Sequence, residues 1–481
     1  MESLLISAEN NDISLCTDFY QLTMAAAYYL GPKPIRKRKG IFELFVRKLP
    51  QNRSYIVAAG LEQALYFLLN IRFNEKQTSY LKSTDAFKTI SKDFFEYLKE
   101  FKFTGTVWAV PEGTILFPNE PILRIESSII EAQIVETYLL SIINFQSLIA
   151  TKASRIVNAA RGKPVIEFGS RRAHGPHAGV LAARASYIGG CSGTSNTLAG
   201  FKLGIPVFGT MAHSFIMAFE KEDDAFEQFN SVFPSSFLLV DTYDSINAIK
   251  KIIQARIPIN GIRLDSGDLY SLSMETRNLL DKAGYRDSKI MASGDLNEYL
   301  IEDLLKKDAP IDFFAAGTEL VTSRDDPAMN GVYKLVAVKL PSSQSLSCSS
   351  VPSENKTGDN YNGDNELMLL YKIKKSPGKK TYPGPKQIHR FLENNLLKTD
   401  LVTLEDENIS EGNSIPLLRK VVDRGQILEE SPPVHMLRSL HLKQLNILPS
   451  KFKDLYFVPE KFPVEYSEKL NAVLRKISSN Q

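Results

Sequence analysis

Apolar and polar positions alternate along the chain in two patterns, one typical of helices and one typical of short strands. Before residue 126 the two patterns are mixed. Helical spacing predicts helices over 17–30, with Thr17 as the N-cap, over 60–69 and over 92–101. The run 41–49 alternates like a strand, and proline-punctuated apolar runs over 105–126 predict a small β-sandwich or barrel.

After a strongly helical stretch over 129–160, short apolar runs alternate with helical patterns. Each run ends in a polar or glycine-rich turn, and successive runs start roughly 20 to 40 residues apart, the length of a βα unit. The runs cover 164–172, 205–214, 237–245, 261–269, 289–296 and 312–320, with 332–340 as a further strand. Such alternation implies parallel strands with right-handed crossovers, in a closed or incomplete (β/α) barrel. A doubly wound open sheet is the alternative, and either fold gathers polar residues at one face.

These patterns divide the chain of 481 residues into four segments. We expect an N-terminal α+β module over 1–128 and an α/β barrel over 129–340. Residues 341–365 are polar and rich in serine and asparagine, which predicts a flexible insertion. Strand-like order resumes beyond it, and we expect the segments over 366–481 to pack on the barrel and on the N-terminal module.

The composition is that of a globular protein, with 43% hydrophobic and 23% charged residues. The net charge of +3 gives no reason to expect a nucleic-acid partner. Residues 33–39 form a basic cluster, which is more typical of a solvated loop than of a substrate-gathering surface. The sequence shows neither a signal pattern nor a long apolar run, so we expect no membrane span. Three widely spaced cysteines without metal or disulfide spacing indicate a reducing, cytoplasmic setting.

The ends of the predicted strands carry an unusual number of arginine, carboxylate, threonine and glycine residues. They are Glu167, Arg171, Arg172, Thr210, His213, Asp241, Arg263, Asp265, Asp268, Asp295, Gly317 and Thr318. Arginine forks and backbone amides at turns suit phosphate, whereas carboxylates suit Mg²⁺ or sugar hydroxyls. The set therefore indicates a site for a phosphorylated sugar.

Structural interpretations compete with this functional one. The sequence SGD, at 266–268 and again at 293–295, is also what a turn followed by a helix N-cap requires. Arg263 and Asp265 lie two residues apart on one face of a strand, where they would also form an ion pair inside a barrel. Two copies of SGD after successive predicted strands favour the functional interpretation.

His213 is the most informative single residue. It is one of only six histidines, and it follows a predicted strand and a Gly-Thr-Met turn. No second histidine or cysteine lies at zinc-binding spacing. His213 is therefore a candidate general acid or base, or a candidate nucleophile.

Ten segments, in order along most of the chain, resemble the nicotinate phosphoribosyltransferase family. They are TDFYQLTM (17–24), FELFVRKLP (42–50), EFGSRRAHGP (167–176), GGCSGTSNTLAG (189–200), GTMAHSF (209–215), DTYDS (241–245), IRLDSGDL (262–269), AAGTELVTS (315–323), GVYKLV (331–336) and KTYPGPKQIHR (380–390). The resemblance implies an irregular (β/α) barrel of the type II phosphoribosyltransferase kind, with an N-terminal α+β module joined by C-terminal segments. It also implies a homodimer whose site is built from both subunits.

The implied reaction joins nicotinate to phosphoribosyl pyrophosphate, with coupled ATP hydrolysis, in NAD salvage. The resemblance makes His213 the residue that ATP phosphorylates, and Tyr20 a ring that stacks on the pyridine from the partner subunit. The other implied substrate-binding residues are Thr210 and Arg263 for nicotinate, Arg171 and Asp241 in the same pocket, Thr381 for the sugar phosphate, and Asp265, Gly294 and Gly317 for ribose, metal or phosphate. Mg²⁺ is the expected cofactor, with Mn²⁺ as the alternative, and its ligands are not implied. Some relatives have an acidic residue where this chain has His177, to which no role is assigned.

Three alternatives remain at this point. Nicotinamide or quinolinate phosphoribosyltransferases share the general fold, and quinolinate, with two carboxylates, would need more cationic groups. A sugar-phosphate aldolase would need a Schiff-base lysine at a strand end, and none of the six principal strand ends carries one. A non-catalytic metabolite sensor would retain ligand binding without activity.

Overall fold

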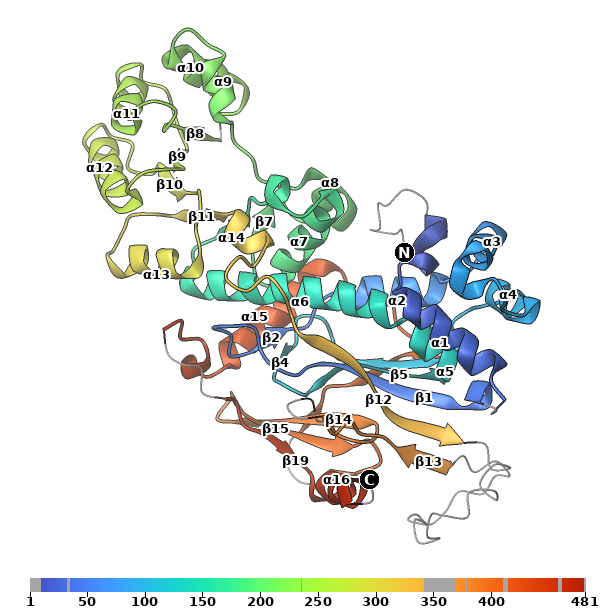
Figure 1. The fold of residues 1–481 in the computed structure, drawn as a ribbon. Coiled ribbons are helices and arrows are strands. Elements are labelled where there is room, and N and C mark those ends of the chain that lie inside the picture. The colour runs from blue at the N-terminus through green and yellow to red at the C-terminus, as the bar shows by residue number, and fades with distance from the viewer. Residues whose placement is uncertain are drawn as a thin grey trace.

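The computed structural model describes residues 10–32, 35–234, 236–340, 368–376, 379, 381–409, 414–456 and 461–479. The insertion predicted over 341–365 lies outside the described residues. Two sheets of mainly antiparallel strands lie at one end of the molecule and a parallel sheet lies at the other, with a long helix between them (Figure 1). Among the described helices, none combines the length and the apolar character that crossing a membrane requires.

A seven-stranded antiparallel sheet draws its strands from distant parts of the chain, in the order β13-β12-β1-β5-β3-β17-β18. Its strands are β1 (Lys39–Val46), β3 (Thr106–Ala109), β5 (Pro121–Ser128), β12 (Gly331–Leu340), β13 (Met368–Tyr371), β17 (Arg419–Asp423) and β18 (Gln426–Ile427). The expectation that 332–340 adds a strand to the barrel is wrong, because β12 pairs with β1. Either sheet would bury the apolar side chains of this strand, so its sequence alone does not specify which sheet it joins.

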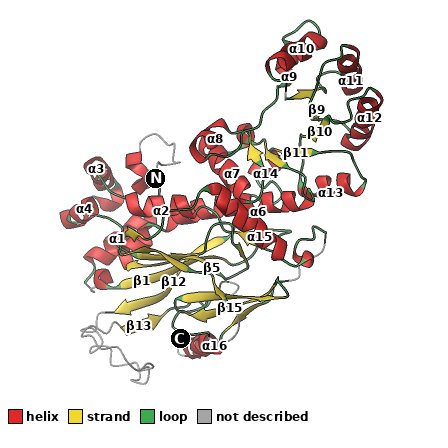
Figure 2. Cartoon of the chain, turned by 180° about the vertical axis from the view of Figure 1, so that it is seen from behind, coloured by secondary structure: helices red, strands yellow, loops and turns green. Residues whose placement is uncertain are grey.

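A four-stranded sheet, ordered β16-β14-β15-β19, lies beneath the seven-stranded sheet (Figures 1 and 2). Its strands are β14 (Lys386–Glu393), β15 (Leu396–Leu404), β16 (Ile415–Pro416) and β19 (Val464–Tyr466), and β2 (Ile56–Val57) separately pairs with β4 (Ile115–Leu116). The buried Lys386 ammonium lies 2.6 Å from the Glu43 carboxylate of β1. This ion pair ties a C-terminal strand to the N-terminal sheet.

Short helices cover the seven-stranded sheet on its other face. They are α1 (Phe19–Leu30), α2 (Leu61–Asn70), α3 (Glu75–Ser83), α4 (Lys92–Lys99) and α5 (Ile129–Ile134). The prediction that Thr17 caps α1 is wrong, since Asp18 is the N-cap residue and the Thr17 hydroxyl donates to the carbonyl of Ile134. Tertiary contact with α5 has replaced the local cap.

Helix α6 (Glu136–Ala159) joins the two ends of the molecule (Figure 1). Its 24 residues correspond to roughly 36 Å at the usual helical rise. Leu139 and Ile143 belong to the apolar core of the N-terminal module, whereas Ala153 and Ile156 belong to the core around the parallel sheet. The predicted helix over 129–160 is thus divided at Val135 into α5 and α6.

The parallel sheet has the strand order β7-β6-β11-β10-β9-β8. Its strands are β6 (Val165–Glu167), β7 (Gly193–Thr194), β8 (Phe237–Leu239), β9 (Gly261–Leu264), β10 (Lys289–Ala292) and β11 (Phe313–Ala316). All their pairings are parallel, as the alternation of predicted strands and helices implies. In the described residues no strand pairing joins β7 to β8, so the sheet is an open, irregular barrel.

The strand predicted over 205–214 is wrong. Only Val207 forms a bridge, to Thr194, and the chain then passes to the helix that begins at His213. This segment is exposed on one side, with Val207 56% accessible, so it gains little from completing the sheet. The open side of the barrel lies here.

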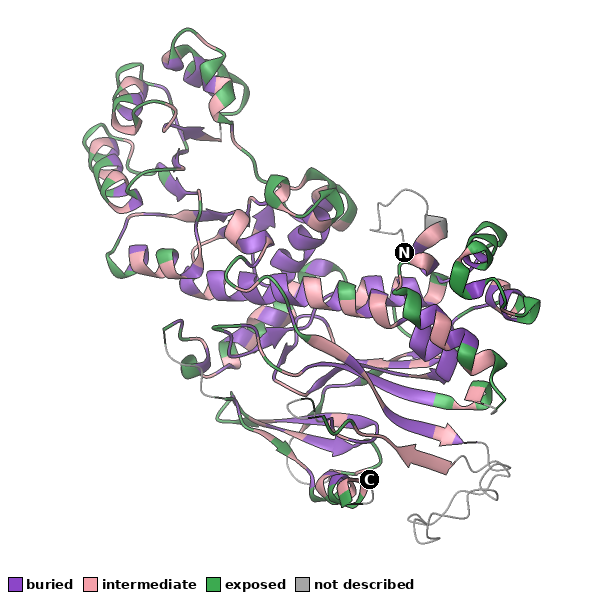
Figure 3. Ribbon diagram, in the orientation of Figure 1, coloured by how far each residue is buried: buried purple, intermediate pink, exposed green. Residues whose placement is uncertain are grey.

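Helices flank the parallel sheet along the chain. They are α7 (Pro176–Ile188), α8 (Thr197–Leu203), α9 (His213–Met217), α10 (Glu222–Val232), α11 (Ser245–Gln254), α12 (Leu269–Lys282), α13 (Glu298–Lys306) and α14 (Thr318–Val321). Of the C-terminal helices, α15 (Val434–Ile447) packs on α7 and α16 (Glu468–Ser479) on β15. Figure 3 shows buried strands within this half and helices whose outer faces are exposed.

Candidate active site

The Arg263 side chain lies at the centre of the candidate site. It comes from β9 and is only 9% exposed. Its Nη2 donates to Asp265 Oδ1 over 2.6 Å, its Nε to Ser293 Oγ over 2.8 Å and its Nη1 to Thr210 Oγ1 over 3.2 Å. Burial by itself would raise the pKa of Asp265, but the Arg263 charge and the Ser293 hydrogen bond outweigh it and lower that pKa. The pair thus remains charged and supplies a fixed cation.

His213 and Asp241 form a second pair next to the first. His213 begins α9, and its Nε2 lies 3.2 Å from Asp241 Oδ1, which follows β8. The His213 side chain is 42% exposed, whereas the Asp241 side chain is 3% exposed. Ser266 donates a hydrogen bond to the other oxygen of Asp241 over 2.5 Å. An Nε2–H that donates to Asp241 leaves the Nδ1 lone pair free to act as a nucleophile.

A buried carboxylate shapes the turn that follows β6. Glu167 accepts hydrogen bonds from the Thr194 hydroxyl and from the backbone N–H of Gly169. Burial raises the Glu167 pKa, although both hydrogen bonds oppose that rise. The turn carries Phe168, whose ring lies 5.5 Å below the Arg263 guanidinium. This aromatic face restricts the directions in which Arg263 can point.

Two glycines of the predicted site lie where little space is available. Gly294 has φ +103°, and a Cβ there would lie 2.5 Å from the Asp265 carbonyl oxygen. A Cβ on Gly317 would meet the Phe168 carbonyl oxygen at 3.2 Å. Arg171 is exposed in the 3₁₀ turn Ser170–Arg172 after the Phe168 turn. Gly294 thus borders Asp265, and Gly317 borders the turn that carries Phe168.

The predicted residues that contact one another are Thr210, His213, Asp241, Arg263 and Asp265. Single donor atoms from His213, Asp241 and Asp265 all lie within 4.8 Å of one another. Two carboxylates and an imidazole suit Mn²⁺, and the carboxylates alone suit Mg²⁺ together with substrate phosphates. The buried hydroxyls of Ser170 and Thr242 have no hydrogen-bond partner within the described part of the chain.

Two predicted residues lie far from this group within one chain. Tyr20 is on α1, at the opposite end of α6 from α9 (Figures 1 and 2), and its side chain is half exposed. Thr381 is buried in the segment between β13 and β14, where its Oγ1 accepts a hydrogen bond from the Lys374 N–H over 2.9 Å. A single chain therefore does not bring the complete predicted set together.

Several cations lie around Lys334, and the backbone N–H of one of them, Lys374, contacts Thr381. Burial lowers the pKa of Lys334, and the neighbouring charges of Lys374, Arg47 and Lys379 lower it further, although Glu136 opposes them. The Nε and Nη2 atoms of Arg47 are buried and lack a partner among the described residues. The sequence prediction missed this group, because the cations belong to three separate segments. An anionic ligand would compensate their charge.

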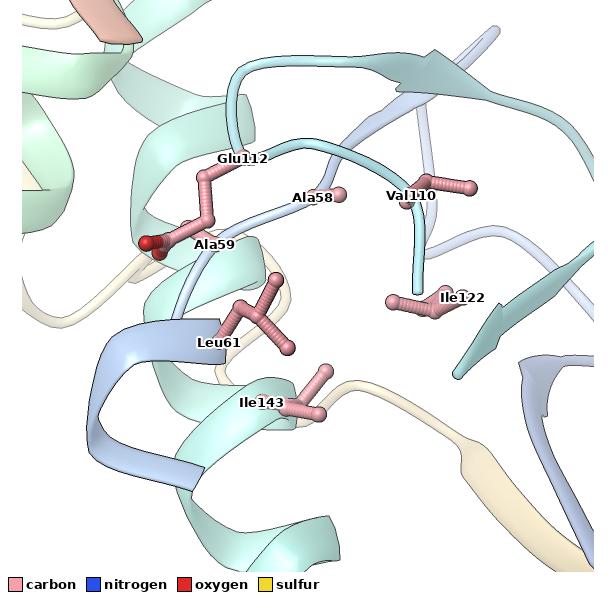
Figure 4. Close-up of a pocket in the computed structure, with 7 residues that line it drawn as sticks. All are labelled: Ala58, Ala59, Leu61, Val110, Glu112, Ile122 and Ile143. Carbon is pink, nitrogen blue, oxygen red and sulfur yellow. The ribbon is translucent and has the colours of Figure 1, made fainter. Parts of the chain in front are cut away.

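A small cavity in the N-terminal module is not a substrate site. Figure 4 shows Glu112 among six apolar side chains that line it. Its volume of about 10 Å³ accommodates no more than a water molecule. Both Glu112 oxygens already accept hydrogen bonds from Arg184, and one also accepts from the N–H of Gly60.

The prediction also missed Ser266, Ser293 and Phe168 as members of the site. Both serines belong to the repeated SGD motif, of which the sequence analysis predicted only the aspartates, Asp268 and Asp295, as candidates. Asp268 caps α12 by accepting hydrogen bonds from the N–H groups of Tyr270 and Ser271. The serines, and not the motif aspartates, contact the site carboxylates.

Comparisons with known proteins identify the fold and the family of this chain. The profile of the nicotinate phosphoribosyltransferase (NAPRTase) N-terminal domain matches residues 15–144, and that of the quinolinate phosphoribosyl transferase C-terminal domain matches residues 149–325. The crystal structure of human nicotinic acid phosphoribosyltransferase is similar, with a TM-score of 0.77 and 26% identity over 96% of this chain and 99% of that chain. The fold is therefore that of the type II phosphoribosyltransferases.

Two curated relatives narrow the class. Nicotinate phosphoribosyltransferase pncB2 of Mycobacterium tuberculosis is 41% identical over 471 residues, which cover 96% of this chain and 94% of the relative. Nicotinate phosphoribosyltransferase of Bacillus subtilis is 36% identical over 489 residues, with the same two coverages. The chain belongs to the nicotinate phosphoribosyltransferase family.

Proposed function

We propose that the chain transfers the phosphoribosyl group of phosphoribosyl pyrophosphate to nicotinate, with ATP hydrolysis coupled through phosphorylation of His213. The products are nicotinate mononucleotide and diphosphate, together with ADP and phosphate, and the reaction serves NAD salvage in the cytoplasm. The observation that carries the proposal is the Arg263 guanidinium, held by three side chains beside the His213–Asp241 pair.

Arg263 supplies the charge that the nicotinate carboxylate needs. Its three hydrogen bonds and the Phe168 ring hold it in place before the substrate binds, so little side-chain entropy is lost on binding. Departure of diphosphate leaves an oxocarbenium-like sugar, which needs positioning and charge stabilisation more than covalent help. The pyridine nitrogen then attacks the anomeric carbon.

The His213–Asp241 pair suits a phosphoryl acceptor. Asp241 fixes the ring through Nε2, and the partly exposed imidazole is accessible to the γ-phosphate of ATP. A phosphoryl group on His213 adds roughly two negative charges next to Arg263 and so changes the affinity of the pocket for anionic substrates. Phosphorylation would tighten substrate binding, and dephosphorylation would release product.

Mg²⁺ is the proposed cofactor, with Mn²⁺ as a substitute. The carboxylates of Asp241 and Asp265 are the residues that would hold it. When bound, the ion neutralises the charge that develops on the departing diphosphate. Gly294 and Gly317 are proposed to lie beside the ribose or phosphate groups, since both sit in close turns that border Asp265 and Phe168.

A homodimer would complete the site. Tyr20, half exposed on α1, is available to stack on the pyridine ring of a substrate bound in the partner's barrel. Lys334 and the cations around it, including Arg47, would meet the phosphate groups of the sugar substrate. Arg171 would contribute from the barrel to the same pocket.

The substrate is tested by direct assay. We expect nicotinate mononucleotide when nicotinate, phosphoribosyl pyrophosphate, Mg²⁺ and ATP are all supplied, and a slower reaction without ATP. Nicotinamide and quinolinate should be poor substrates under the same conditions, because the expected pocket offers one fixed cation and accepts one carboxylate. A higher kcat/KM with either of these pyridines would overturn the assignment.

The shared site is tested by mixing two inactive chains. Tyr20→Ala and Arg263→Ala should each reduce activity strongly, since each removes one side of the pyridine site. Dissociating and reassociating the two variants together should restore activity, because one of the two sites in a mixed dimer contains both native residues. Absence of any recovery, with mixed dimers verified by mass, would exclude a site built from two subunits.

A quinolinate phosphoribosyltransferase is the second candidate, since the quinolinate profile covers residues 149–325. The N-terminal profile and the curated relatives favour nicotinate. The assay with three pyridines separates the two candidates directly.

A further inference from the structure

The two SGD motifs form similar turns at the ends of neighbouring strands. Ser266 lies two residues after β9, and Ser293 directly follows β10. The glycine after each serine has a positive φ, +83° for Gly267 and +103° for Gly294. Residues with a Cβ rarely adopt this conformation, so glycine is the residue that suits both turns. The repeated tripeptide is thus explained in part by its backbone.

Each serine reaches back to the carboxylate that follows the preceding strand. Ser266 Oγ donates to Asp241 Oδ2, beyond β8, over 2.5 Å. Ser293 Oγ donates to Asp265 Oδ1, beyond β9, over 2.5 Å. Strands β8, β9 and β10 are neighbours in that order, so both contacts connect one strand to the next. The sequence repeat is therefore also a repeat of side-chain contacts.

Helix capping does not account for this repeat. Asp268 of the first motif caps α12, but α13 is capped by Asn297, whose side chain accepts a hydrogen bond from the Leu300 N–H over 2.9 Å. The aspartates of the two motifs thus have different surroundings. What the motifs share is the contact from serine to carboxylate.

The two serines stabilise different parts of the site. Ser266 holds one oxygen of Asp241 while the other oxygen faces His213, which restricts rotation of the carboxylate. Ser293 accepts a hydrogen bond from Arg263 Nε over 2.8 Å and so directs its single proton to Asp265. Arg263, Ser293 and Asp265 therefore form a closed ring of hydrogen bonds.

We propose that Ser266 and Ser293 are positioning residues with separate tasks. Ser266 sets the orientation of the His213 imidazole for phosphorylation through Asp241. Ser293 sets the Arg263 guanidinium for the substrate carboxylate, both directly and through Asp265. This inference rests on the proposed function, because the two tasks are steps of that reaction.

The test compares two measurements in each variant of the full-length protein. The rate of ³²P transfer from labelled ATP to His213 reports the first task, and the KM for nicotinate reports the second. Ser266→Ala should slow phosphorylation by about tenfold or more, the usual effect of losing a hydrogen bond to a charged group, and should alter the nicotinate KM much less. Ser293→Ala should raise the nicotinate KM by about tenfold or more and should slow phosphorylation of His213 much less.

Two further variants serve as controls. Ser266→Thr keeps the hydroxyl, and because Ser266 is exposed the added methyl group has room, so phosphorylation should return toward the native rate. Ser271 donates to Asp268 over 2.6 Å at the start of α12, a similar contact outside the site. Ser271→Ala should leave both measurements at their native values.

The outcomes distinguish failure of this inference from failure of the proposed function. Equal effects of Ser266→Ala and Ser293→Ala on both measurements, or no rescue by Ser266→Thr, would overturn the division of tasks. If native protein acquires no phosphate on His213, the ATP coupling fails and the role of Ser266 fails with it. The role of Ser293 is then still decided by the nicotinate KM.

Discussion

Replacing His213 with alanine should abolish ATP hydrolysis that is coupled to product formation, while slow ATP-independent transfer persists. The imidazole is the only proposed phosphoryl acceptor, whereas Arg263, Asp265 and Thr210 remain to bind substrate. Any improvement of substrate affinity by ATP, about 5–150-fold for a coupling of usual size, should disappear. Nicotinate mononucleotide and ADP are measured in the same reaction, and their ratio reports how tightly ATP hydrolysis is coupled to product formation.

His435→Ala is the matched control, because His435 is an exposed histidine on α15. It should keep the native ratio of ADP to nicotinate mononucleotide. If His213→Ala still hydrolyses ATP in step with product, His213 is not the phosphate carrier.

Glu298→Gln should lower the free energy of unfolding by about 3–5 kcal/mol, the usual cost of removing one partner from a buried charge group. The completely buried Glu298 carboxylate lies 2.6 Å from Lys152 Nζ and 3.0 Å from Arg155 Nε, and Arg53 lies 3.9 Å away. Burial would raise the Glu298 pKa, but Lys152 and Arg155 outweigh it and lower that pKa. Without the carboxylate, Asp325 would still pair with Arg53 and Lys152, whereas Arg155 would lose the charged partner that it has among the described residues.

Denaturant unfolding followed by circular dichroism measures this loss. Asp303→Asn is the control on the same helix, since the Asp303–Lys307 pair is about half exposed and water screens its charges, so that its loss should change the free energy of unfolding little. Similar losses for the two variants would contradict the view that the buried group stabilises the junction of α6 and α13.

The helices and strands that could be predicted were those marked by a pattern in their own sequence. Parallel strands β6 and β8–β11 have continuous apolar runs bounded by turns, and helical periodicity marked α1, α2, α4 and α6. The strand over 205–214 was overpredicted, because apolar content alone does not show that a neighbouring strand will pair along its whole length. The two-residue strand β7 is too short to leave any periodic signal.

The residues of the candidate site also fall into two groups, those that local sequence patterns predicted and those that they did not. Thr210, His213, Asp241, Arg263 and Asp265 were found because strand ends of a parallel sheet meet at one face. Phe168 and the serines 266 and 293 were missed, since their importance depends on contacts between strands. The group around Arg47 and Lys334 was also missed, because no local pattern connects their segments.

By itself, the sequence determined the alternating strand–helix order, the family and the residue types of the site, because each is a matter of local spacing. Tertiary structure alone decided that β12 joins the antiparallel sheet, that the barrel stays open beside His213, and that each SGD serine holds the previous strand's carboxylate. It also placed helix α1, which carries Tyr20, and strands β13 and β14, which flank Thr381, at the other end of the molecule from helix α9, which begins at His213. These features depend on which distant segments share a core, and hydrophobic periodicity does not encode that choice.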